Sequence, residues 1–148
     1  MKKIFKMKEI KLLTIKFFKK MIKDKLNLSD LHFEHTLWNN ELAFYKDELS
    51  VLEPRIYELS TKYTSKEVLE GIEHFQNQFL IQKQNIHDLQ HDINAHEKNL
   101  AGFAQDNPVG IDQLYFSNHA PFRQKMEKQR TIYHDLKKGF FLFLEKWM

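Results

Sequence analysis

The sequence predicts an all-α protein, an antiparallel bundle of three long heptad-patterned helices, preceded by a basic amphipathic helix that could dock as a fourth. Two observations lead to this fold class. Apolar residues recur in alternating steps of four and three along most of the chain, which is the pattern of helices packed at small crossing angles. The chain of 148 residues holds only four Gly and three Pro, so long uninterrupted elements are expected.

The chain divides into two parts by charge and by apolar pattern. We expect a basic helix in residues 1–28 and a three-helix bundle in residues 29–148, with helices at about 30–62, 65–104 and 113–147. The second of these helices starts where Thr64-Ser65-Lys66-Glu67 has the spacing of a capping box. A break over residues 102–112, which contain Gly and Pro, precedes the third helix. Short connections of this kind make consecutive helices antiparallel neighbours.

Each bundle helix has a regular set of heptad core positions. In the first helix they are Leu31, His35, Trp38, Leu42, Tyr45, Leu49, Leu52, Ile56 and Leu59. In the second they are Val68, Ile72, Phe75, Phe79, Gln82, Ile86, Leu89, Ile93, His96, Leu100 and Phe103. In the third they are Tyr115, His119, Phe122, Met126, Gln129, Tyr133, Leu136, Phe140, Phe143 and Trp147. We predict that these residues form the core.

Antiparallel folding brings the heptad core positions of the three helices into level layers. Tyr45, Gln82 and Gln129 then share one polar layer, either a hydrogen-bonded layer that fixes the register or the wall of a small ligand cavity. Two charged edges also face each other: Glu34, Glu41 and Glu48 on the first helix, and Arg123, Arg130 and Lys137 on the third. Because the first and third helices run parallel, we expect these edges to pair, as the edges of coiled coils do.

The basic character of the protein is concentrated at its start. Residues 1–25 hold ten Lys against two acidic residues, a balance of +8, whereas the other 123 residues have a balance of −5. Within residues 4–22 one helix face is apolar, formed by Met7, Ile10, Phe17, Phe18, Met21 and Ile22. Such a helix can complete the bundle, lie on an anionic membrane surface, or contact phosphates of a nucleic acid. The acidic bundle argues against nucleic acid.

A second apolar stripe lies outside the heptad core of the first long helix. It consists of Leu37, Phe44 and Val51, spaced by seven residues. Apolar stripes outside a core mark contacts. If the chain turns near Asn27–Ser29, the basic helix can fold back over this stripe. Otherwise the stripe is a surface for a homodimer or for another protein partner.

Three histidines occupy heptad core positions, one on each bundle helix: His35, His96 and His119. The register places them in adjacent layers near one end of the bundle. Three imidazoles and a water form a known zinc arrangement, in which zinc lowers the pKa of its water to about 7. The residues are thus candidate ligands for zinc or another transition metal. Alternatively they are a polar plug satisfied by hydrogen bonds, with Tyr115 as a partner.

The sequence lacks the motifs of most catalytic classes. Without Cys it has no disulfide, no thiolate metal site and no cysteine nucleophile. It contains no Glu-x-x-His, as ferritin-type di-iron sites require, no His-Glu-x-x-His, no Gly-rich phosphate loop and no Gly-x-Ser-x-Gly. We therefore expect a protein that is not an enzyme and needs no cofactor.

The function expected from these observations is that of an interaction or scaffold protein that acts through its surfaces. One alternative is a metal-binding bundle with a three-histidine core site. The other is a membrane-surface protein anchored through residues 1–25. The chain shows no secretory signal and no run of the ~20 apolar residues that a membrane span needs, so a cytoplasmic location is expected.

Overall fold

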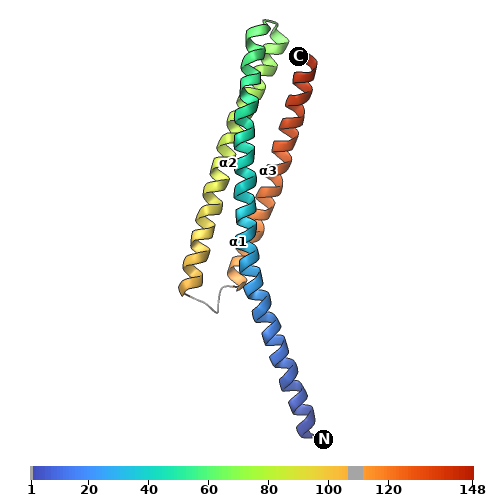
Figure 1. Cartoon of the computed structure of the whole chain (residues 1–148), viewed down its shortest axis with the longest axis vertical. Coiled ribbons are helices and arrows are strands. Elements are labelled where there is room, and N and C mark those ends of the chain that lie inside the picture. Colours follow the sequence, from blue (N-terminus) through green and yellow to red (C-terminus); the bar gives the residue numbers. More distant parts are fainter. Residues whose placement is uncertain (1, 107–111) are drawn as a thin grey trace. The chain divides into compact units, whose positions relative to one another are not determined.

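The computed structural model contains three long helices and, in the backbone that it describes, no strand (Figure 1). Helix α1 spans Lys2–Lys62, α2 spans Lys66–Asp106 and α3 spans Asp112–Trp147. The structure describes the backbone of residues 2–106 and 112–148, and the side chains of residues 6–16, 30–103, 105–106 and 119–148. The prediction of an all-α helical bundle is confirmed.

Helix α1 is much longer than the helix expected at residues 30–62. It starts at Lys2 and its backbone is helical through residues 27–29, so the turn that we expected there is wrong. The reason is visible in the sequence, because residues 2–53 contain neither Gly nor Pro and nothing in them stops a helix. The packing of the basic helix over Leu37, Phe44 and Val51 concerns the placement of the two parts of the chain and stays a prediction.

The other helix ends lie close to their expected places. Helix α2 begins at Lys66, so Ser65 precedes it and the Ser65 carbonyl accepts a hydrogen bond from the Leu69 N–H at 3.1 Å. The break before α3 is shorter than expected, since α2 continues past Gly102 to Asp106. An isolated Gly inside a helix costs about 1 kcal/mol relative to Ala, which a long packed helix tolerates.

The chain forms two compact units, residues 1–36 and 37–148. The first unit consists of the N-terminal part of α1. In it, every side chain from Lys6 to Lys16 is exposed, whereas Leu31 and His35 are each only 2% exposed. These two buried residues are heptad core positions, as predicted.

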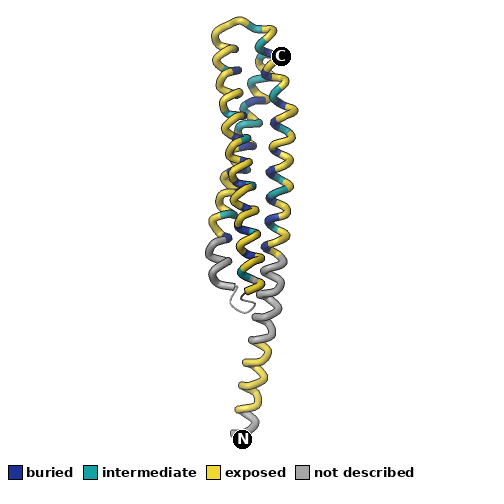
Figure 2. The backbone as a smooth tube through the Cα atoms, turned by 90° about the vertical axis from the view of Figure 1, so that its left-hand side faces the viewer, coloured by how far each residue is buried: buried dark blue, intermediate teal, exposed yellow. Residues whose placement is uncertain are grey.

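The second unit is the helical bundle with its core. Among the described residues, all buried side chains of this unit are predicted core positions. The backbone tube is dark blue where a residue is buried, and such stretches recur along the helices (Figure 2). Phe75, Phe122, Leu136, Phe143 and Trp147 are half-buried and pack against that core. Tyr115 lies outside the described side chains.

Polar contacts define the helix directions inside the second unit. Glu41 pairs with Arg130 and Glu48 with Lys137, so the partners advance together and α1 runs parallel to α3. Between α1 and α2 the partners advance in opposite directions, with Asn39 bonded to Asn94 and Glu53 paired with Lys83. Glu67 with Lys146 and Gln82 with Gln129 show the same antiparallel relation between α2 and α3. The predicted register is thus confirmed where these contacts report on it.

Candidate functional site

Two of the candidate histidines meet in the core of the bundle. The rings of His96 on α2 and His119 on α3 are stacked, with centroids 6.0 Å apart and an interplanar angle of 28°. Trp38 on α1 stacks on His119 at 5.1 Å, and Phe122 stacks on His96 at 4.7 Å. The four rings form a column in the order Trp38, His119, His96, Phe122, to which all three helices contribute.

The histidines are in the column because each replaces an apolar residue in a heptad. His96 follows Ile93 by three residues and precedes Leu100 by four, so it faces inward like both of them. Exposure of His96 is 8% and that of His119 is 2%. Each neutral imidazole has one donor and one acceptor nitrogen, and which is which depends on the tautomer. The acceptor nitrogen is also the atom that binds zinc, copper, nickel or iron.

A hollow lies beside His96. It has a volume of about 380 Å³ and is lined by Asp92, Ala95, His96 and Asn99 of α2 and by Pro121 and Phe122 of α3. Although His96 is almost fully buried, its surroundings therefore include open space between α2 and α3.

The third predicted ligand, His35, belongs to the other compact unit. It is 2% exposed, as predicted for a heptad core position, and it precedes Trp38 by three residues on the same helix. The predicted approach of His35 to His96 and His119 stays a prediction. The same holds for Tyr115 as a hydrogen-bond partner, because its side chain is outside the described residues.

The predicted polar layer exists, but its tyrosine is used differently. Gln129 Nε2 donates to Gln82 Oε1 at 2.6 Å, and the two amides are 6% and 2% exposed. The hydroxyl of Tyr45 donates instead to Glu41 Oε1 at 2.5 Å, at the α1–α3 edge. The tightly bonded pair of amides supports the interpretation as a layer that fixes the register.

The edge between α1 and α3 is a repeated network. Arg130 Nε and Nη2 donate to the two carboxylate oxygens of Glu41 at 2.6 and 2.9 Å. One heptad further along, Lys137 Nζ donates to Glu48 at 2.9 Å, and the Tyr133 hydroxyl donates to the same carboxylate. Sequence reasoning predicted the ion pairs and missed the tyrosines. The available signal was that a Tyr at a core position needs a partner for its hydroxyl.

The hydrogen bonds of this network shift the pKa values of its carboxyl and phenol groups. Burial alone would raise the pKa of Glu41, but hydrogen bonds from Arg130 and Tyr45 outweigh it and hold the pKa below the usual 4.5. Burial would also raise the pKa of Glu48, but hydrogen bonds from Lys137 and Tyr133 outweigh burial and lower it. Burial and the accepting carboxylates raise the pKa of both tyrosines far above 10. At neutral pH neither tyrosine can act as a base, and both carboxylates are fully ionised.

The outer stripe of α1 is exposed as predicted. Leu37 is 49% exposed, Phe44 58% and Val51 71%. The neighbouring Glu41 and Glu48 are compensated by their partners on α3. Two of the carboxylates next to the stripe are therefore compensated, whereas Asp47, which is exposed between Phe44 and Val51, adds a negative charge to this face.

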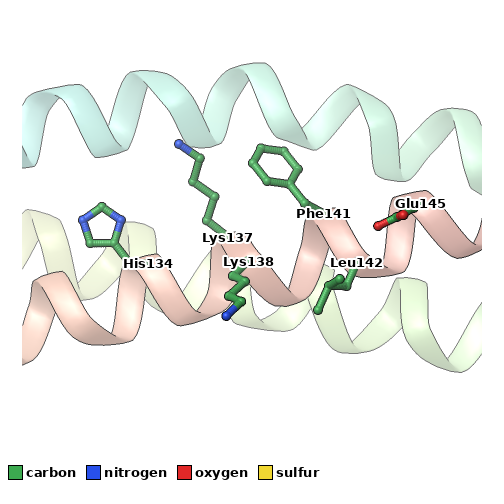
Figure 3. Close-up of a pocket in the computed structure, with 6 residues that line it drawn as sticks. All are labelled: His134, Lys137, Lys138, Phe141, Leu142 and Glu145. Atoms are coloured by element: carbon green, nitrogen blue, oxygen red, sulfur yellow. The ribbon is translucent and has the colours of Figure 1, made fainter.

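A second hollow, of about 300 Å³, lies on α3 beside the edge where α1 and α3 pair (Figure 3). It is lined by His134, Lys137, Lys138, Phe141, Leu142 and Glu145. The amino group of Lys137 is already held by Glu48, and it lies 5.7 Å from the centroid of the Phe141 ring. All residues that line this hollow come from one helix, and the charge of Lys137 is compensated by Glu48. We therefore interpret the hollow as a surface groove and not as a ligand-binding site.

No family model, curated protein or solved structure matches this chain. In the described part of the chain, none of the helices has an apolar stretch of the length needed to cross a membrane.

Proposed function

We propose that this protein is a non-enzymatic interaction protein that binds a protein partner through the stripe of Leu37, Phe44 and Val51. The exposure of this stripe is the observation that supports the proposal. Three large apolar side chains lie in line on one helix face, and between 49% and 71% of each is in contact with solvent. The described core positions of the same helix are buried. An aligned apolar stripe outside the core is typical of a contact surface.

A second copy of the chain is the partner that this surface fits. In a twofold dimer the same surface meets itself, so uncompensated charge next to the apolar stripe would repel its counterpart. Glu41 and Glu48 beside the stripe are neutralised by Arg130 and Lys137. Compensation of these two carboxylates reduces the like-charge repulsion between copies, to which Asp47, exposed between Phe44 and Val51, still contributes.

The molecular mass in solution tests this proposal. We expect light scattering of the full chain to give a dimer at micromolar concentrations and Phe44→Glu to give a monomer with unchanged helix content. Leu80→Glu is the matched control, since Leu80 is a 68% exposed apolar residue on α2. It should leave the dimer intact. A wild-type chain that stays monomeric, or a dimer that Phe44→Glu does not weaken, contradicts the proposal.

Metal binding is a second candidate function, and the stacked His96–His119 pair supports it. Imidazole is the ligand that zinc, copper and nickel share in proteins. We propose that His35, His96 and His119 bind one transition-metal ion, with zinc as the first to be tested. The burial of all three imidazoles at heptad positions and the hollow beside His96 favour this role. Without a metal they form the polar plug described above.

Metal content of the untagged protein, purified without chelator and measured by elemental mass spectrometry, tests this second function. We expect close to one ion per chain, lost in His96→Ala and in His119→Ala. The matched control is His87→Ala with His91→Ala, an exposed pair one turn apart on α2. Wild-type protein that binds no zinc, copper, nickel or iron at micromolar supply rules out the metal role. Loss of metal only in the control pair would place the site on the surface.

A further inference from the structure

The basic part of α1 exposes apolar and charged side chains together. All side chains from Lys6 to Lys16 are exposed. The large apolar ones are Met7 at 61%, Ile10 at 59%, Leu12 at 59%, Leu13 at 66% and Ile15 at 53%. Met7, Ile10 and Leu13 follow one another by three residues and share one side of the helix, whereas Leu12 and Ile15 lie elsewhere around it.

The charge of the same segment selects the kind of partner. Lys6, Lys8, Lys11 and Lys16 are opposed only by Glu9 in this stretch. The wider segment of residues 1–25 has a balance of +8, whereas the other 123 residues have −5. The fitting surface is therefore negatively charged and can also accept apolar side chains.

We propose that Lys6–Lys16 binds the surface of an anionic lipid bilayer. Met7, Ile10 and Leu13, on one side of the helix, enter the boundary between headgroups and acyl chains, and the Lys side chains extend along the helix to reach lipid phosphates. Met7 and Ile10 belong to the apolar face predicted for residues 4–22. Lys residues recur too often for the segment to enter the bilayer core, so the helix lies on the surface and does not span it.

A nucleic acid would contact the Lys side chains of this segment but not its apolar side chains. Phosphate contacts use the Lys side chains and leave the five apolar side chains in water. An anionic bilayer takes both kinds of side chain at once. The inference does not use the stripe of Leu37, Phe44 and Val51, and it stands or falls separately from the proposed dimer.

Flotation of the full chain with lipid vesicles tests the inference. We expect binding to vesicles of phosphatidylcholine with phosphatidylserine, much weaker binding to phosphatidylcholine alone, and loss of binding at high salt because the surface charge is screened. Exchange of Lys6, Lys8, Lys11 and Lys16 for Glu should weaken binding at least about a hundredfold. Ile10→Asn with Leu13→Asn keeps the charge and should also weaken binding, because apolar insertion is lost.

Two controls separate this site from general attraction of the protein to anionic lipid. Exchange of four exposed bundle residues, Lys46, Lys62, Lys98 and Lys128, for Glu gives the same net charge and should leave vesicle binding nearly unchanged. Phe44→Glu should not affect it either. Circular dichroism checks that each variant remains helical. The inference is overturned if wild type does not bind the anionic vesicles, or if the bundle control weakens binding as much as the Lys6–Lys16 variant. The inference is also overturned if the protein binds duplex DNA more tightly than the anionic vesicles and if Ile10→Asn with Leu13→Asn leaves the DNA binding unchanged.

Discussion

The ring of Tyr45 on α1 stacks on the ring of Tyr133 on α3, with centroids 4.1 Å apart and an interplanar angle of 25°. Both rings lie in the core, and both hydroxyls reach carboxylates at the edge, Glu41 and Glu48 respectively. A basic residue of α3 holds each carboxylate from the other side. This repeat of phenol, carboxylate and base links core packing to edge pairing, and it accounts for the parallel register of α1 and α3.

Acid should weaken the bundle through these carboxylates. The pKa values of Glu41 and Glu48 are lower in the folded protein than in the unfolded chain, so both groups stabilise the fold above their usual pKa of 4.5. That contribution is lost as the pH falls below this value through the folded pKa. We expect the unfolding temperature to drop between about pH 5 and about pH 3. Glu41→Gln with Glu48→Gln should be less stable at pH 7 and should show a flatter dependence in thermal unfolding. An unchanged slope would contradict this role.

Alkaline pH should destabilise the bundle through Tyr45 and Tyr133, whose pKa values are shifted upward, in the direction opposite to those of the carboxylates. Their folded pKa values are raised, so they stabilise the fold fully below the usual value of 10 and lose that contribution as the pH rises beyond it. We expect Tyr45→Phe with Tyr133→Phe to cost about 3–6 kcal/mol at pH 7, because two hydrogen bonds to charged groups are lost at about 1.5–3 kcal/mol each. The loss of wild-type stability above about pH 10, followed by urea unfolding, should be smaller in this variant. Equal losses in both proteins would show that other groups dominate.

The buried amide pair should show strong coupling. Gln82→Leu alone leaves the Gln129 amide buried without its partner and should cost about 1–3 kcal/mol in the free energy of unfolding. Gln82→Leu with Gln129→Leu removes both polar groups and should be close to wild type or more stable. Urea unfolding of the two single variants and the double variant gives the coupling energy. Additive single effects would mean that the amides do not depend on each other.

Two helical glycines should respond to Ala with opposite signs. At Gly71 an added Cβ would lie 2.3 Å from Cε2 of the half-buried Phe143 ring, so Gly71→Ala should destabilise by about 1–3 kcal/mol. At Gly102, among the described residues beyond its own helical turn, no atom lies within 4 Å of the added Cβ, so Gly102→Ala should stabilise by up to about 1 kcal/mol through helix propensity. Phe143→Leu should relieve the cost at Gly71. The comparison is made by thermal unfolding, and a gain in both Ala variants would refute the close packing of Phe143.

Apolar spacing alone predicted much of this architecture. Every buried side chain that the structure describes had been assigned to the core, and the edge pairs Glu41–Arg130 and Glu48–Lys137 followed from the register. The heptad repeat fixes which face of each helix is inside and, with short connections, which layers meet. The meeting of His96 with His119 also follows from their adjacent layers.

Other features depend on information that the repeat does not contain. The aromatic column requires particular side-chain rotamers of Trp38 and Phe122, and the packing of Phe143 on Gly71 requires the local helix separation. The turn near Asn27–Ser29 was placed where the charge and the apolar pattern of the chain change. Charge composition does not end a helix. Gly, Pro or a cap can end one, although α1 contains Pro54, α2 contains Gly102 and α3 contains Pro121. The absence of Gly and Pro in residues 2–53 was the better guide to α1.

A spin label at Asp47 tests the central proposal, that the stripe of α1 pairs two copies of the chain. Asp47 is an exposed residue between Phe44 and Val51, and the chain has no Cys, so Asp47→Cys can be labelled at a single site. Pulsed dipolar spectroscopy of the full chain should then detect coupling between labels on two copies, and Phe44→Glu in the same chain should abolish it. Absence of coupling in the labelled protein, or coupling that survives Phe44→Glu, would contradict the account.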